Sequence, residues 1–250
     1  MRLRLLFAAL LGLLLCLAVP AEAAFTFKQG EALVPGTTNG ATGVSLAFGS
    51  NVTANSLLVV CVRIGDTSTT ITGITDTVGT SYSQVTTQQL ATDGDTLFFW
   101  AGLVAGGAGA DTVLVKFSAS GSNLEYDIGE FGSNGTQTQD TFGSANTLNA
   151  SAGTIGGSLT LAGANELLVG VTGVASSGDT FAATGSFTKV VSPQSKVFTV
   201  YWIQTTQTNT DIGDSISPAD EQASILVAYK QAGGVVTPPV PQRTLRGVGT

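Results

Sequence analysis

Three carboxylates stand close together in a chain that is otherwise poor in charge. The segment LEYDIGEF carries Glu125, Asp127 and Glu130, while charged residues make up only 11% of the sequence. Two carboxyl groups about 5–5.5 Å apart carry out retaining glycoside hydrolysis, and a third acid can separate their pKa values. The segment could therefore act on a glycan, provided that one strand presents all three side chains together.

Apolar and acidic residues alternate from Leu124 to Ile128, as a strand with one buried face requires. Strict alternation would then bury Glu130 and expose Phe131. A β-bulge at Gly129 would reverse both placements. We therefore expect a bulged strand whose polar outer face carries the three carboxylates.

This Glu-x-Asp-x-x-Glu spacing resembles the active-site strand of the laminarinase-like, retaining β-glucan hydrolases, which are β-sandwiches. The resemblance implies Glu125 as nucleophile, Glu130 as acid/base and Asp127 as the group that tunes the pair. Those enzymes surround the strand with aromatic side chains in a long cleft. Here the two Trp residues, Trp100 and Trp202, lie in runs typical of a core. A solvated polar face is the alternative.

Other chemistry is restricted by what the sequence lacks. Histidine is absent, which excludes Ser-His-Asp and Cys-His mechanisms and His-ligated zinc. Of the two Cys residues, Cys16 lies in the N-terminal leader and Cys61 in the apolar run LLVVCVRI, so we expect Cys61 to be a buried thiol without a disulfide partner.

Carboxylates in loops are the remaining candidate ligands for a metal cofactor. Asp93 and Asp95, and Asp211 and Asp214, could contribute oxygen ligands to Ca²⁺. Asp-Gly more often marks a turn, so we predict no cofactor, with calcium as the alternative. Asp76, before Gly79, is expected to cap a turn.

Aromatic side chains could stack on a sugar if they were exposed. The candidates are Tyr82, Tyr201 and Trp202. Because aromatics at alternating strand positions usually build a core, we expect these three to be buried.

The elements that must position these residues are short β-branched and aromatic runs separated by Gly, Asn and Asp. We expect strands at Val44–Phe48, Leu57–Ile64, Thr69–Ile74, Ser81–Thr86, Thr96–Leu103, Thr112–Ser118, Asn123–Phe131, Ser158–Leu161, Glu166–Val174, Ser186–Val191, Lys196–Gln204 and Ala223–Lys230.

The two halves of this series are similar. ANSLLV at 54–59 recurs as ANELLV at 164–169, and the aromatic runs FFW at 98–100 and VYW at 200–202 correspond. The strand ASILVAYK takes the place of LEYDIGEF. We therefore predict an all-β, two-sheet antiparallel β-sandwich with jelly-roll or Greek-key connections, built from two duplicated half-units.

Both ends differ from this domain. Residues 1–23 have a basic start, an apolar stretch and an Ala-Glu-Ala cleavage site, as in a secretory signal peptide. Residues 232–250 are rich in Pro and Gly, as in a linker or disordered tail. We expect a β-sandwich domain at 24–231, no membrane span after cleavage, and an extracellular or periplasmic location.

The order of ANSLLVVCV, ITDTVGTSY, LFFWAGLVAGG, VLVKFSAS, EFGS and ILVAYK resembles a loosely defined β-sandwich module of secreted bacterial proteins. Its most recognisable part is Asp76, Gly79 and Tyr82. The resemblance implies a fold and a compartment but no reaction, since that module has no established activity.

The net charge of −7, without a basic cluster, argues against nucleic acid and anionic membranes as partners. We favour a secreted, non-catalytic protein that binds or displays at a surface, with a glycan or a surface protein as its partner. The alternatives are a retaining β-glycan hydrolase that uses Glu125 and Glu130, and a structural spacer or assembly subunit.

Overall fold

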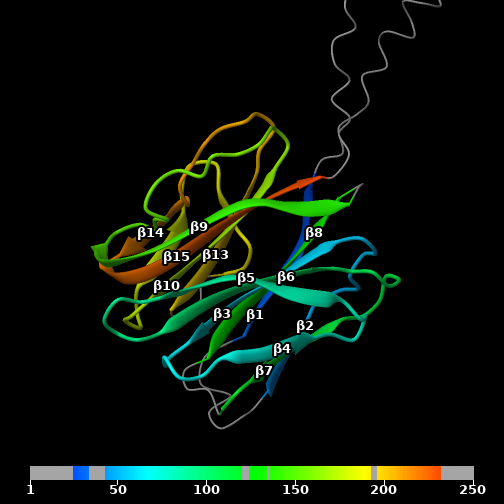
Figure 1. Ribbon diagram of the computed structural model, residues 1–250, viewed down its shortest axis with the longest axis horizontal. Helices are drawn as coiled ribbons and strands as arrows, with labels where there is room; N and C mark the ends of the chain where they lie inside the picture. The colour runs from blue at the N-terminus through cyan, green and yellow to red at the C-terminus, as the bar shows by residue number, and fades with distance from the viewer. Residues whose placement is uncertain (1–24, 34–42, 120–123, 134–135, 193–195, 232–250) are drawn as a thin grey trace, which may run out of the picture.

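The computed structural model describes residues 25–33, 43–119, 124–133, 136–192 and 196–231. Within these ranges the chain is all-β, and every strand pairing is antiparallel (Figure 1). The first half of the chain forms β1 (Thr26–Leu33), β2 (Gly43–Ala47), β3 (Leu57–Ile64), β4 (Ile71–Thr75), β5 (Ser81–Gln89), β6 (Thr96–Leu103), β7 (Thr112–Phe117) and β8 (Glu125–Gly132).

The second half contributes the remaining strands. They are β9 (Gln137–Ala150), β10 (Leu167–Val174), β11 (Thr180–Ala183), β12 (Thr188–Lys189), β13 (Val197–Ile203), β14 (Asp214–Ser217) and β15 (Asp220–Gln231).

Two five-stranded sheets pack face to face in the centre of the molecule. Their strand orders are β1-β8-β3-β6-β5 and β12-β13-β10-β15-β9. A three-stranded sheet, β2-β7-β4, covers the outer face of the first, and the pair β11-β14 lies on the outer face of the second (Figure 1). The first half has the connectivity of a jelly roll, in which strands β1-β8-β3-β6 face strands β2-β7-β4. Strand β5 is added beside β6.

Three apolar layers hold this arrangement together. The central layer joins the two five-stranded sheets and contains Val59 and Phe99 from one and Val169 and Ile225 from the other. The two outer layers fill the space between each five-stranded sheet and its cover. The central strands β3 and β10 are therefore buried on both faces, which explains their continuous apolar sequences.

The two five-stranded sheets repeat one pattern. From one edge to the other, β1-β8-β3-β6-β5 corresponds to β9-β15-β10-β13-β12. Asn55 and Asn165, before β3 and β10, both have positive φ, at 64° and 59°. Asn tolerates this left-handed conformation better than most residues, so the two strands begin with the same local geometry. The correspondence between strands of the two halves agrees with the sequence repeat. That the two halves arose by duplication stays a prediction.

The predicted all-β sandwich is confirmed, with differences in its elements. The polar strands β1 and β9 and the short strands β11 and β14 were not among the predicted strands. The strand expected at Ser158–Leu161 is reduced to one bridge, from Leu159 to Thr210, and Ser186–Val191 contains only β12.

The predicted signal peptide at 1–23 and the predicted tail at 232–250 lie outside the described residues. In the described part of the chain, no helix has the length and hydropathy to cross a bilayer.

Candidate functional site

The carboxylates of β8 do not share a face. The register between β3 and β8 is regular from Arg63↔Glu125 to Leu57↔Phe131, with no bulge at Gly129. Glu125 and Asp127 therefore point toward the central layer, and Glu130 points to the opposite face. The predicted bulge and the predicted polar outer face are wrong. Strict alternation is possible because both faces of β8 are covered, so neither Glu130 nor Phe131 meets water.

Gly129 has a different role from the one expected. A Cβ atom at this position would lie 3.0 Å from Cγ1 of Val190 and 3.2 Å from Cγ2 of Val59. Glycine thus permits close packing between β8 and the chain that precedes β13, rather than a change of strand register.

Glu130 is 1% exposed and serves as an acceptor for the chain before β3. Its Oε1 accepts hydrogen bonds from the Thr53 N–H (2.7 Å) and the Ser56 hydroxyl (2.8 Å). Its Oε2 accepts one from Nε2 of Gln29 on β1 (2.7 Å). These bonds satisfy a buried carboxylate and fix a loop, which is a structural role.

Asp127 lies between the two five-stranded sheets. Its Oδ2 accepts a hydrogen bond from the Thr199 hydroxyl on β13 of the opposite sheet (2.7 Å), while its Oδ1 has no partner. Burial raises the pKa of Asp127 to about 8, and the charge of Glu125 adds to the effect. Its cross-strand neighbour on β3 is Cys61, which is a buried free thiol, as predicted. Burial and the nearby Asp127 raise the pKa of this thiol.

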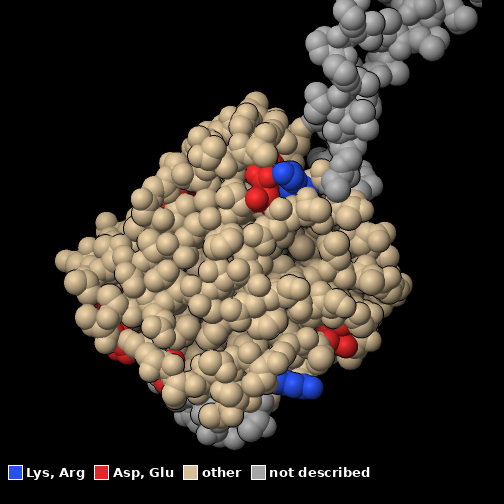
Figure 2. Space-filling model, in the orientation of Figure 1, with Lys and Arg blue, Asp and Glu red and all other residues tan. Residues whose placement is uncertain are grey.

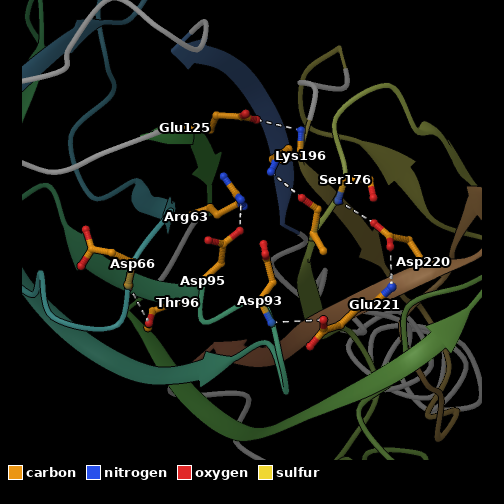
Figure 3. A network of polar contacts seen from close by, with 11 residues as sticks. Arg63, Asp66, Asp93, Asp95, Thr96, Glu125, Ser176, Lys196, Asp220 and Glu221 are labelled. Carbon is orange, nitrogen blue, oxygen red and sulfur yellow. Dashed lines mark hydrogen bonds and ion pairs between the residues drawn. The ribbon is translucent and has the colours of Figure 1, made fainter.

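Glu125 belongs to a polar network at one end of the central layer (Figure 3). Its Oε2 accepts the backbone N–H of Lys196 from the second half (2.9 Å). Nearby, the buried Arg63 forms an ion pair with Asp95, and Glu221 accepts the N–H of Asp93 (3.2 Å). The network therefore joins residues of both halves across the interface between their sheets.

Of the four loop carboxylates considered for calcium, Asp95, Asp211 and Asp214 are already engaged by protein groups, while Asp93 contributes only its backbone N–H. Asp95 pairs with Arg63, and Asp93 lies beside Glu221 in the same network (Figure 3). Asp211 accepts the N–H groups of Ile155 (2.9 Å) and Ile212 (2.7 Å). Within the described ranges no group of three or more His, Cys, Asp or Glu side chains could hold a metal.

Asp214 is also held by the backbone. It accepts the N–H of Gly153, and burial raises its pKa. Like Asp211, it fixes the chain that follows β9.

Tyr82, Tyr201 and Trp202 were expected to be buried, and the structure leaves all three partly exposed while they pack against the protein. Tyr82 donates to Asp76 (3.0 Å), which also accepts the N–H of Gly79 (2.7 Å), so Asp76 caps a turn as predicted. Tyr201 stacks on Phe27 with ring centroids 4.7 Å apart, and the ring of Trp202 lies 5.8 Å from that of Phe187.

The accessible surface that stands out is the margin where β5 and β9 run side by side, which we call the β5–β9 margin. Each is the last strand of its sheet, and Nδ2 of Asn146 donates to the Gln89 carbonyl (2.8 Å) to link them. Both cross the front of the view in Figure 1. Phe142 and Leu148 on β9, at 44% and 61% exposed, are the large hydrophobic residues that the described part of the chain leaves exposed.

Sequence reasoning missed this surface because β9 was not recognised as a strand. Its sequence QTQDTFGSANTLNA has few β-branched residues and no clear alternation. The signal that could have identified β9 is a stretch after Asp140 that has no charged residue or Pro and contains the isolated Phe142.

Comparison of the chain with protein-family models, with curated proteins and with solved structures gave no match.

Proposed function

We propose that the protein is a secreted, non-catalytic module that acts by binding a partner protein through its β5–β9 margin. The observation that supports this proposal is the contrast between the buried candidate acids of β8 and the accessible β5–β9 margin. The candidate acids Glu125 and Glu130 are buried on opposite faces of one sheet, whereas the margin, whose Asp140 pairs with Lys230, is accessible and carries exposed Phe142.

A hydrolase of the retaining type needs two carboxyl groups beside the same bond of the substrate. Glu125 and Glu130 are 2% and 1% exposed, and a sheet lies between their side chains. The geometry therefore favours the non-catalytic function over the hydrolase alternative.

An edge strand is a natural contact surface for another protein. Its free N–H and C=O groups can pair with an extended segment, while exposed side chains provide specificity. β9 offers 14 residues and β5 offers nine, on the same side of the molecule.

A neutral glycan is a second candidate, favoured by the chemistry around Phe142. Its ring lies on the face of β9 that also carries Asn146, because their cross-strand partners Val227 and Ala223 both belong to the central layer. An exposed ring beside amide and hydroxyl groups can stack on a sugar and form hydrogen bonds with its hydroxyls.

The test is retention of the labelled secreted chain by the surface of the producing cells and by insoluble β-glucans and galactans. We expect retention by the cell surface, its loss in Phe142→Ala, and no effect of Thr188→Ala on the far edge strand. Retention by pure polysaccharide would select the glycan instead. Reducing-sugar release that disappears in Glu125→Gln would contradict the proposal.

A further inference from the structure

The edges of the two central sheets are protected on one side of the molecule and unprotected on the other. On the first side, β1 carries Lys28, Glu31 and a bulge, and β12 is only two residues long and includes Lys189. Short strands, bulges and charged residues are the features with which proteins prevent strands from pairing edge to edge. On the other side, β5 has an irregularity between Gln84 and Thr86 but no charged residue or proline, and β9 has no charged residue or proline from Thr141 to its end.

The middle of β9 is also regular. From Thr141↔Ala228 to Thr147↔Gln222, each residue has one partner on β15, and the irregular positions lie outside this stretch. A regular stretch keeps its N–H and C=O groups in line for a further strand. Both five-stranded sheets end on this side, so one partner can extend both.

The distribution of charge leaves this margin open to a partner that is itself acidic. The chain has a net charge of −7, so two copies repel one another over most approaches. Figure 2 shows few charged side chains across the middle of the face that carries β5 and β9. Asp140 on β9 is neutralised by Lys230. Two acidic molecules can therefore meet here with the least repulsion.

We propose that this margin binds a second copy of the chain, with the two β9 strands paired antiparallel around Ser144. Such pairing is isologous, because a twofold axis at Ser144 places Phe142 of one copy opposite Asn146 of the other. No charges face one another in the stretch from Thr141 to Thr147. The exposed Phe142 rings, which lie at the edge of the central layer, become covered when both sheets continue into the second copy.

This inference rests on the proposed function, since it names the partner that the margin binds. A strand from another protein would also fit the backbone of β9. The second copy is favoured because the margin is neutral on an acidic chain and self-complementary about one residue, neither of which a different partner requires.

The experiment is the molar mass of the secreted chain by light scattering over a range of concentrations. We expect twice the mass of one chain. Ser144→Lys and Ser144→Glu should each halve that mass, because like charges then face one another at the axis. An equimolar mixture of the two variants should restore it. Thr188→Lys, on the protected edge of the same sheet, should leave the mass unchanged.

Circular dichroism and the melting temperature establish that each variant is folded, and Asn146→Lys, at an exposed position, provides a second disruption. A dimer that persists in all three β9 variants, or a mixture that stays at the mass of one chain, would overturn the inference. A wild-type monomer whose retention by cells still depends on Phe142 would also overturn it, while leaving the proposed function intact. A monomer without such retention would refute both.

Discussion

Asp127 lies in an environment very different from that of a carboxyl group in water. It lies between two sheets, bonds to Thr199 across the interface, and has a pKa raised by burial to about 8. In the unfolded chain the pKa of Asp is about 3.9. Between these two values the folded protein binds a proton that the unfolded protein releases, so the free energy of unfolding falls as the pH rises.

Asp127→Asn should remove this contribution. We expect the wild type to lose stability relative to the variant between pH 4 and pH 8, with a slope of up to about 1.4 kcal/mol per pH unit. The measurement is urea unfolding of both proteins across this range. Because Asn keeps an acceptor for Thr199, the two should be similar near pH 4. Parallel pH profiles would show that Asp127 ionises normally in the folded state.

At the scale of single elements, the central strands could be predicted, whereas the polar edge strands β1 and β9 could not. Runs such as LLVVCVRI of β3 are buried on both faces, so their composition alone identifies them. β1 and β9 are polar, and their pairing depends on contacts with distant strands. The placement of Glu130 failed for a related reason, because alternation along β8 does not reveal how many layers cover it.

Gly170 shows how tightly β10 packs against the outer layer. A Cβ atom there would lie 2.6 Å from Cδ1 of Ile212 and 3.3 Å from Cδ1 of Leu226. Gly170→Ala should therefore lower the free energy of unfolding by about 1–3 kcal/mol. The control is Gly73→Ala on β4, where a Cβ atom would meet nothing within 4 Å. Equal midpoints for the two variants in chemical denaturation would contradict this packing.

At the scale of the whole molecule, the two halves share their central layer and the network around Glu125 and Lys196. Neither half can expose its five-stranded sheet without exposing that of the other. The repeat in the sequence agrees with the places of these strands in the two sheets, but it could not show that the two five-stranded sheets would face one another.

The halves should therefore unfold together. The two Trp residues report on them separately, since Trp100 on β6 packs against one outer layer and Trp202 on β13 against the other. We expect Trp100→Phe and Trp202→Phe variants, each with one remaining Trp, to show fluorescence transitions that coincide with loss of circular dichroism. Separate transitions within either variant would mean that the halves are independent domains.

The account depends most on the margin where β5 and β9 meet being the surface that binds. Hydrogen–deuterium exchange of the chain, first diluted until it has the mass of one chain and then bound to the surface of the producing cells, tests this directly. The result we predict is slower exchange in peptides that cover residues 81–89 and 137–150 on binding, with no change in residues 26–33. Protection of β1 with an unchanged β9 would contradict it and place the binding surface on the opposite side of the molecule.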